Sequence, residues 1–272
     1  MATQQDRDTQ HAEHPIASTL THYLSLLVFA FLTASSSHAD DIHIAVASNF
    51  TSAMKEVTKA FEENTSHQVK LSFGSSGKLY AQISHGAPFE LFFSADQSKP
   101  IALEKNGLAI KGSRFTYAEG SLALWTVKDS FADLTEKTLT ERKYRKLALA
   151  NPRLAPYGQA AVEVLNELNL ASTTRKKWVQ GENISQTYQF VSTGNAELGF
   201  VALSQILNHD KGIKGSAWII PHNLYKPIRQ DAVLLMKGKS SQAAREFMSF
   251  ITGNQARTII ESHGYKTSTN SQ

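Results

Sequence analysis

Residues 42–49 have the sequence IHIAVASN, a short apolar strand that runs directly into a hydroxyl-bearing turn before a helix. Residues 69–77, VKLSFGSSG, repeat this strand-to-turn arrangement. A helix N-terminus presents unpaired backbone N–H groups and the positive end of the helix dipole, and a neighbouring serine adds a neutral hydroxyl donor. Because the carboxyl ends of neighbouring parallel strands meet at one edge of a sheet, the two turns should converge on one ligand. The sequence therefore predicts an anion site at this edge.

Strands and helices alternate along the rest of the chain. The first predicted elements are a strand at 42–47, a helix at 51–63, a strand at 69–73, a helix at 78–85 and a strand at 91–93. This βαβαβ order is typical of parallel pairing in an α/β fold. The later predicted elements are strands at 120–127, 147–150 and 198–202, helices at 158–168 and 185–192, an extended piece at 227–236, and terminal helices at 241–252 and 255–263. The pattern predicts two α/β units joined by two crossings of the chain, near 117–120 and 225–231.

The N-terminal segment resembles a secretion signal. Residues 24–32, LSLLVFAFL, form a short apolar run, and Ser37-His38-Ala39 has the small-x-small form of a signal-peptidase site. We therefore expect residues 1–39 to be a signal peptide and the mature chain to begin near Asp40, in the periplasm. A membrane anchor is the alternative interpretation, but the run is shorter than the about 20 apolar residues that span a bilayer.

Composition excludes several classes of function. The chain has no cysteine, which excludes disulfides, zinc-thiolate sites and cysteine nucleophiles. Removal of residues 1–39 changes the net charge from +4 to +6, with 27 basic and 21 acidic side chains left. This mildly basic balance favours anionic ligands, but the lysines and arginines are scattered without aromatic interleaving, so no nucleic-acid partner is expected. The ten histidines show no metal-binding spacing, so we expect no metal cation site and no cofactor.

The motif Gly74-Ser75-Ser76-Gly77-Lys78 invites enzymatic interpretations. A P-loop needs four residues between its first glycine and the Gly-Lys pair, whereas two intervene here. A Ser-x-x-Lys nucleophile is formally present as Ser75 and Lys78, but the Ser-Asp-Asn and Lys-Thr-Gly elements that accompany it are missing. We therefore expect that the protein is not an enzyme.

Four turns carry the candidate donors. Ser48 and Ser76 follow the first two strands, where a serine also has a structural interpretation as a helix N-cap. Tyr157 and Ile184 stand at the starts of two further helices, where the backbone N–H of each would be a free donor. An apolar residue such as Ile184 can serve a ligand through its amide alone.

Longer motifs extend this pattern over the whole chain. They are AVASNF at 45–50, FGSSGKL at 73–79, GAPFELFFSAD at 86–96, ELGFV at 197–201 and the helical segment 247–265. With them, residues 40–268 resemble the periplasmic molybdate-binding proteins of ABC transporters. The resemblance implies a two-lobed periplasmic binding protein fold of type II with two hinge crossovers. Lobe 1 would comprise residues 40–118 plus 228–272, and lobe 2 residues 119–227.

The resemblance also implies the ligand set. Ser48 and Ser76 would supply donors from lobe 1, and Tyr157 and Ile184 would supply amides from lobe 2. Many members of the family place a tyrosine hydroxyl on the ligand at the position that Ala202 occupies here. Asn49 resembles a subgroup in which an asparagine at this turn contributes instead.

The function that the resemblance implies is transport. The protein would bind molybdate, and tungstate with it, as a monomer in the periplasm, and would deliver it to an ABC permease and its ATPase. A protein of the same fold that binds sulfate or another tetrahedral oxyanion is the near alternative. An exported hydrolase that uses Ser75 or Ser76 with Lys78 is the distant one, and a ligand-sensing domain would need an attached signalling module.

Overall fold

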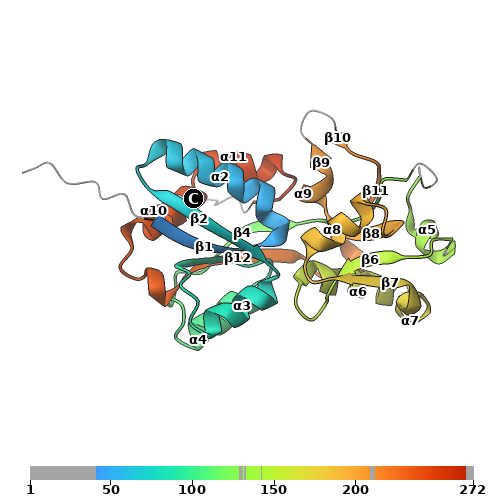
Figure 1. Ribbon diagram of the computed structural model, residues 1–272, viewed down its shortest axis with the longest axis horizontal. Coiled ribbons are helices and arrows are strands. Elements are labelled where there is room, and N and C mark those ends of the chain that lie inside the picture. Colours follow the sequence, from blue (N-terminus) through green and yellow to red (C-terminus); the bar gives the residue numbers. More distant parts are fainter. Residues whose placement is uncertain (1–40, 129–130, 132, 142, 209–211, 268–272) are drawn as a thin grey trace, which may run out of the picture. The chain divides into compact units, whose positions relative to one another are not determined.

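The described part of this computed structural model comprises residues 41–128, 131, 133–141, 143–208 and 212–267. Its strands form two five-stranded sheets and one short two-stranded hairpin (Figure 1). The predicted signal peptide, residues 1–39, lies outside the described residues. Within the described ranges, no helix has both the length and the apolar character that crossing a bilayer requires.

The first sheet has the strand order β2-β1-β3-β12-β4. Strand β1 pairs in parallel with β2 and β3, which confirms the predicted βαβαβ unit, and β12 pairs antiparallel with β3 and β4. The strands are β1 (Asp41–Ala47), β2 (Gln68–Gly74), β3 (Leu91–Phe93), β4 (Phe115–Gly120) and β12 (Ile228–Leu234). The helices around it are η1 (Ser48–Phe50), α2 (Thr51–Asn64), α3 (Ser76–Ser84), α4 (Ser98–Lys105), η5 (Met236–Gly238), α10 (Gln242–Ile251) and α11 (Asn254–Ser262).

Alternation along β1 explains how this sheet is covered on both faces. Ile42, Ile44 and Val46 are fully buried and pack in one core with residues of α2, α10 and α11. Ala45, between them, faces a second core with residues of α3 and α4. Since successive strand side chains point to opposite faces, a continuous apolar run is what a strand covered on both sides requires. Figure 1 shows α2 and α11 on one side of the sheet and α3 and α4 on the other.

The second sheet has the strand order β11-β5-β8-β6-β7. Strand β6 pairs in parallel with β7 and β8, and β5 pairs antiparallel with β8 and β11. The strands are β5 (Leu122–Thr126), β6 (Leu147–Ala150), β7 (Trp178–Gly181), β8 (Leu198–Ala202) and β11 (Ser216–Ile219), and β9 (Leu207–Asn208) with β10 (Gly212–Ile213) makes the hairpin. The helices of this part are α5 (Glu136–Glu141), α6 (Pro156–Glu167), α7 (Ala171–Thr174), η3 (Arg175–Lys177), α8 (Ile184–Ser192), α9 (Leu203–Ile206) and η4 (His222–Leu224).

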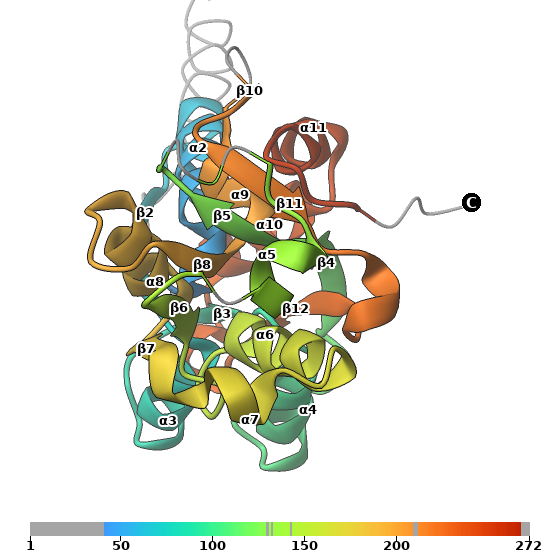
Figure 2. The same ribbon diagram turned by 90° about the vertical axis from the view of Figure 1, so that its right-hand side faces the viewer.

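The second sheet is also covered on both faces. Leu122 and Leu124 of β5 pack in a core with Val164 of α6. Ala123 and Trp125, on the other face of β5, pack in a core with residues of α8 and α9. Figure 2 shows α6 and α8 on different sides of β6 and β8.

The chain passes between the two sheets twice. The sequence predicts one strand over 120–127, but the structure ends β4 at Gly120 in the first sheet and begins β5 at Leu122 in the second. The predicted start of this strand is wrong, because Gly120 pairs with Ile228 while Leu122 pairs with Ala202. Ser121 between them crosses from one sheet to the other, one residue after the crossing predicted near 117–120. The return passage lies between β11 and β12, and the extended piece predicted at 227–236 corresponds to β12.

Candidate functional site

A small cavity, partly open to solvent, lies where turns from both sheets meet. All five residues predicted as ligand donors line it, and none of the lining residues carries a charge. The lining residues are Ala47, Ser48, Asn49, Gly74, Ser75, Ser76, Ala95, Ala155, Pro156, Tyr157 and Ile184. The structure therefore brings together donors that lie more than a hundred residues apart in the sequence.

Each lining segment follows the carboxyl end of a strand. In the first sheet, η1 follows β1, α3 follows β2, and Ala95 follows β3. In the second sheet, α6 follows β6 and α8 follows β7. Ligands of open α/β sheets bind at this edge, and the N-termini of three helices of nine residues or more are directed here by the same topology.

Ser76 is held so that its hydroxyl can donate. Its side chain is buried, and its Oγ accepts a hydrogen bond of 2.9 Å from the backbone N–H of Ala95. Because that bond uses an acceptor lone pair, the hydroxyl hydrogen remains for a ligand. The N-cap interpretation belongs to its neighbour instead: Ser75 Oγ accepts a long bond, 3.4 Å, from the N–H of Lys78.

Ser48 offers a second hydroxyl. It is buried, and its backbone carbonyl accepts bonds from Thr51 Oγ1 at 2.8 Å and from Ser185 Oγ at 3.2 Å. The second of these joins the turn after β1 to the start of α8. Within the described part of the chain, the Ser48 hydroxyl has no protein partner and does not cap its own helix.

Tyr157 and Ile184 contribute backbone amides. In α6, Pro156 occupies the first helical position and has no N–H, so the Tyr157 amide is the first donor that the helix itself cannot satisfy. Ile184 is the first residue of α8, so its amide has no intrahelical acceptor. The Asn183 side chain caps the helix by accepting a 3.0 Å bond from Gln186 N–H and does not occupy the Ile184 amide.

A glycine allows α6 to begin close to the sheet. A Cβ on Gly158 would lie 2.1 Å from the carbonyl oxygen of Ala150, the last residue of β6. Any side chain would therefore push the helix start, and the Tyr157 amide with it, away from the strand end.

Asn49 lines the cavity, but its side chain has partners elsewhere. The amide Nδ2 donates to Gln230 Oε1 at 2.8 Å and to Tyr265 OH at 3.0 Å. Its backbone carbonyl accepts from Tyr265 OH at 2.7 Å and from Ser204 Oγ at 3.1 Å. Both side-chain hydrogens are thus engaged in protein contacts, and the backbone N–H in the short helical turn is the donor that Asn49 has left.

Sequence reasoning did not identify the buried network around Asn49. Gln230, Tyr265 and Ser204 come from β12, the segment after α11 and α9, and no motif links them to the turn after β1. Ala202, where the resemblance would place a tyrosine, ends β8 and does not line the cavity.

The surroundings of the cavity are electrically balanced. The Lys78 ammonium pairs with Glu182 at 2.7 Å, and Asp96 pairs with Lys99. Burial raises the pKa of the Tyr157 phenol well above its ordinary value, so this side chain remains neutral. With Lys78 paired to Glu182 and the Ser75 hydroxyl at the helix cap, the pair that a serine hydrolase would need is not assembled. In the part of the chain that the structure describes, no group of three or more histidine or acidic side chains could hold a metal ion.

This chain is similar to known solute-binding proteins. A family model described as bacterial extracellular solute-binding protein matches residues 42–266. The molybdate-binding protein ModA of Azotobacter vinelandii is 48% identical over 245 residues, which cover 89% of this chain and 97% of that protein. ModA of Rhodobacter capsulatus is 44% identical over 229 residues, covering 84% and 89% of the two chains. The solved structure of the Azotobacter vinelandii periplasmic molybdate-binding protein superposes with a TM-score of 0.81 at 39% identity and covers 84% of this chain and all of that one.

Proposed function

Because the chain belongs to the family of bacterial extracellular solute-binding proteins, we propose that it captures molybdate, and tungstate with it, for transport. Its family consists of binding proteins, so the prediction that it is not an enzyme is confirmed. The relatives that are 48% and 44% identical are named as molybdate-binding proteins, which supports the choice of ligand.

One observation carries the proposal: a small cavity lined by five buried, neutral donor residues from both sheets. A dianionic tetrahedral oxyanion needs only donors, and helix N-termini with hydroxyl groups supply them without a buried lysine or arginine. Ser48 and Ser76 would donate through hydroxyls and backbone, Tyr157 and Ile184 through amides, and Asn49 through its backbone N–H. Since tungstate has nearly the same size and charge as molybdate, these donors would accept both.

Binding would close two lobes on the ligand. In this proposal lobe 1 would comprise residues 40–118 plus 228–272 and lobe 2 residues 119–227, with the two passages of the chain as the hinge. Because β4 runs to Gly120 in the first sheet, the first boundary would lie at Ser121. The contacts that now join the two sheets at the cavity support this, among them the 2.8 Å bond from Gly77 N–H to the Leu154 carbonyl and the Lys78–Glu182 ion pair.

In this proposal the protein acts in the periplasm as a monomer. Residues 1–39 would direct export and be removed, and the loaded protein would deliver its oxyanion to an ABC permease and its ATPase. The related Azotobacter vinelandii structure is named as a periplasmic protein, which supports this location.

The proposal is tested by titration calorimetry of residues 40–272 with molybdate, tungstate, sulfate and phosphate at one pH and ionic strength. Tight binding of the first two, with weak or absent heat for the others, is the expected result. Sulfate as the tightest ligand would assign the protein to another oxyanion class of the same fold, and no binding of any anion would overturn the proposal.

A further inference from the structure

Gln230 stands at the centre of a buried polar network beside the cavity without lining it. Its side chain is fully buried in β12, and its Oε1 accepts from Asn49 Nδ2 at 2.8 Å and from Tyr117 OH at 3.1 Å. Its Nε2 donates to Tyr157 OH at 3.4 Å. One amide group of the returning strand therefore contacts two cavity residues, Asn49 after β1 and Tyr157 at the start of α6.

The Tyr157 phenol reaches this network through a space left by a glycine. A Cβ on Gly120, the last residue of β4, would lie 1.9 Å from Tyr157 OH and 2.7 Å from Gln230 Nε2. The side chain of Tyr157 thus lies against β4 and β12, the two strands of the first sheet that lie next to the passages between the sheets. Its residue also lines the cavity, where the backbone amide is the donor. Holding the phenol in this place fixes the first turn of α6.

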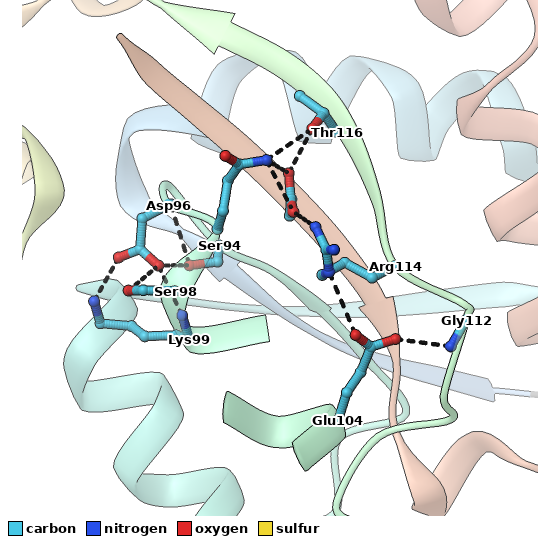
Figure 3. A network of polar contacts seen from close by, with 10 residues as sticks. Ser94, Asp96, Ser98, Lys99, Glu104, Gly112, Arg114 and Thr116 are labelled. Carbon is cyan, nitrogen blue, oxygen red and sulfur yellow. Dashed lines mark hydrogen bonds and ion pairs between the residues drawn. The ribbon is translucent and has the colours of Figure 1, made fainter. Parts of the chain in front are cut away.

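The strand that carries Gln230 is itself held firmly. Pairing of β12 with β4 shifts register between Gln230 and Asp231, and both side chains are fully buried. Asp231 accepts bonds from Thr116 Oγ1 at 2.7 Å and Gln97 Nε2 at 3.1 Å and pairs with Arg114. Figure 3 shows Arg114 also bonded to Glu104, so the ion pair continues into α4. This anchoring on one side of the strand leaves Gln230 fixed on the other.

We propose that Gln230 is a positioning residue of the oxyanion site: its amide holds the Asn49 turn and the Tyr157 phenol in register, so that donors from the two sheets meet the ligand together. This inference rests on the proposed function. It assigns the Tyr157 hydroxyl to Gln230 and its backbone amide to the ligand. It also assigns the Asn49 side chain to this network, so that its contribution to the ligand is the backbone N–H.

The network is neutral throughout, which suits a site for a dianion. Burial raises the pKa values of Tyr117, Tyr157 and Tyr265, so all three phenols stay protonated at any physiological pH. Because these amides and phenols carry no net charge, they add no charge–charge repulsion against a bound anion.

The test compares single and double variants of residues 40–272 by molybdate calorimetry and by thermal unfolding without ligand. Gln230→Met removes the amide at similar volume, and we expect molybdate affinity to fall on the order of tenfold because bonds to Asn49 and Tyr157 are lost. Tyr157→Phe keeps the ring and the backbone amide and should weaken binding by about threefold. The double variant should bind nearly like Gln230→Met alone, because both changes remove the Gln230–Tyr157 contact and only the hydrogen bond of the Tyr157 hydroxyl with Tyr265 is left to lose. Gln230→Asn, which keeps a buried amide but cannot reach both partners, should weaken binding like Gln230→Met.

Gln180→Met is the matched control. Gln180 is an exposed strand glutamine in β7 that does not line the cavity, so its replacement should leave affinity unchanged. If Tyr157→Phe weakens binding equally in the wild-type and Gln230→Met backgrounds, the phenol acts on the ligand directly and the inference is overturned. The same holds if the Gln230 variants lower only the unfolding temperature. Failure of the wild-type chain to bind molybdate would instead refute the proposed function.

Discussion

Alanine substitutions at Ser76 and Ser75 should show which of these two serines donates a hydrogen bond to the ligand. The Ser76 hydroxyl accepts from Ala95 N–H and is free to donate into the cavity, whereas the Ser75 hydroxyl accepts from Lys78 N–H as the helix cap. Both serines are buried and adjacent, so Ser75→Ala is a control of the same size and place. The two substitutions should affect binding and stability differently.

The magnitude follows from the bonds that are lost. A hydrogen bond to a charged group contributes about 1.5–3 kcal/mol, so Ser76→Ala should weaken molybdate binding by about 10- to 150-fold. The substitution also leaves the buried Ala95 N–H without its partner, which costs about 1–3 kcal/mol of stability. Because this cost is present with and without ligand, it lowers the unfolding temperature but cancels in the binding free energy.

Ser75→Ala removes a cap bond that is long, 3.4 Å, so the stability loss should be near the lower end of the about 0.5–2 kcal/mol that caps contribute. Its effect on affinity should stay below about threefold. Calorimetry with molybdate measures the affinity of each variant, and thermal unfolding measures the stability of each. Unchanged affinity in Ser76→Ala, or an equal loss in Ser75→Ala, would refute the assignment of the donor to Ser76.

Three further predictions concern Ser48, the Lys78–Glu182 ion pair and the buried tyrosines. Ser48→Ala should weaken molybdate binding about tenfold by calorimetry with no loss of unfolding temperature, because within the described residues its hydroxyl has no protein partner to lose. Glu182→Gln breaks a half-exposed ion pair with Lys78 and should lower affinity by no more than about fivefold at low salt, and by less at high salt in a salt titration. Burial raises the pKa values of Tyr117 and Tyr265 in the folded state, so their contribution to stability is full below about pH 10 and is lost as the pH rises further; denaturation midpoints that fall already near neutral pH in step with tyrosine ionisation would contradict this.

The parts of the fold that sequence could predict are those set by local patterns. The strand over 42–47 and its turn were predictable because the apolar residues 44–47 end at Ser48, and β3 was predicted with the bounds Leu91–Phe93 that the structure shows. Both observations depend only on the period of burial along one strand. The crossing was predicted near 117–120, one residue before Ser121, where the chain changes sheets. The sequence did not show that residues 120–127 are divided, because only the pairing partners of Gly120 and Leu122 separate the end of β4 from β5.

The candidate site divides in the same way. Turn residues were predictable because donors at strand ends carry a local signal, and all five line the cavity. The division of labour between Ser75 and Ser76, and the engagement of Asn49 with Gln230, depend on bonds between distant segments. A glutamine between Arg229 and Asp231 carries no local sign of its partners, so the role of Gln230 follows only from the bond between β12 and the turn at Asn49.

The selectivity between phosphate and sulfate should depend on the absence of a carboxylate acceptor from the cavity. No carboxylate lines it, and the adjacent Asp96 already accepts from Lys99 N–H and Ser98 Oγ. Phosphate carries a proton at neutral pH that would find no carboxylate to accept it, which costs about 1–3 kcal/mol, whereas sulfate carries no such proton and is limited only by size. The phosphate-to-sulfate affinity ratio should therefore fall as the solution changes from mildly alkaline to mildly acidic, because phosphate gains a second proton and sulfate does not. Competition calorimetry against molybdate measures both anions, and a ratio that does not change with pH would mean that phosphate, too, is excluded by size.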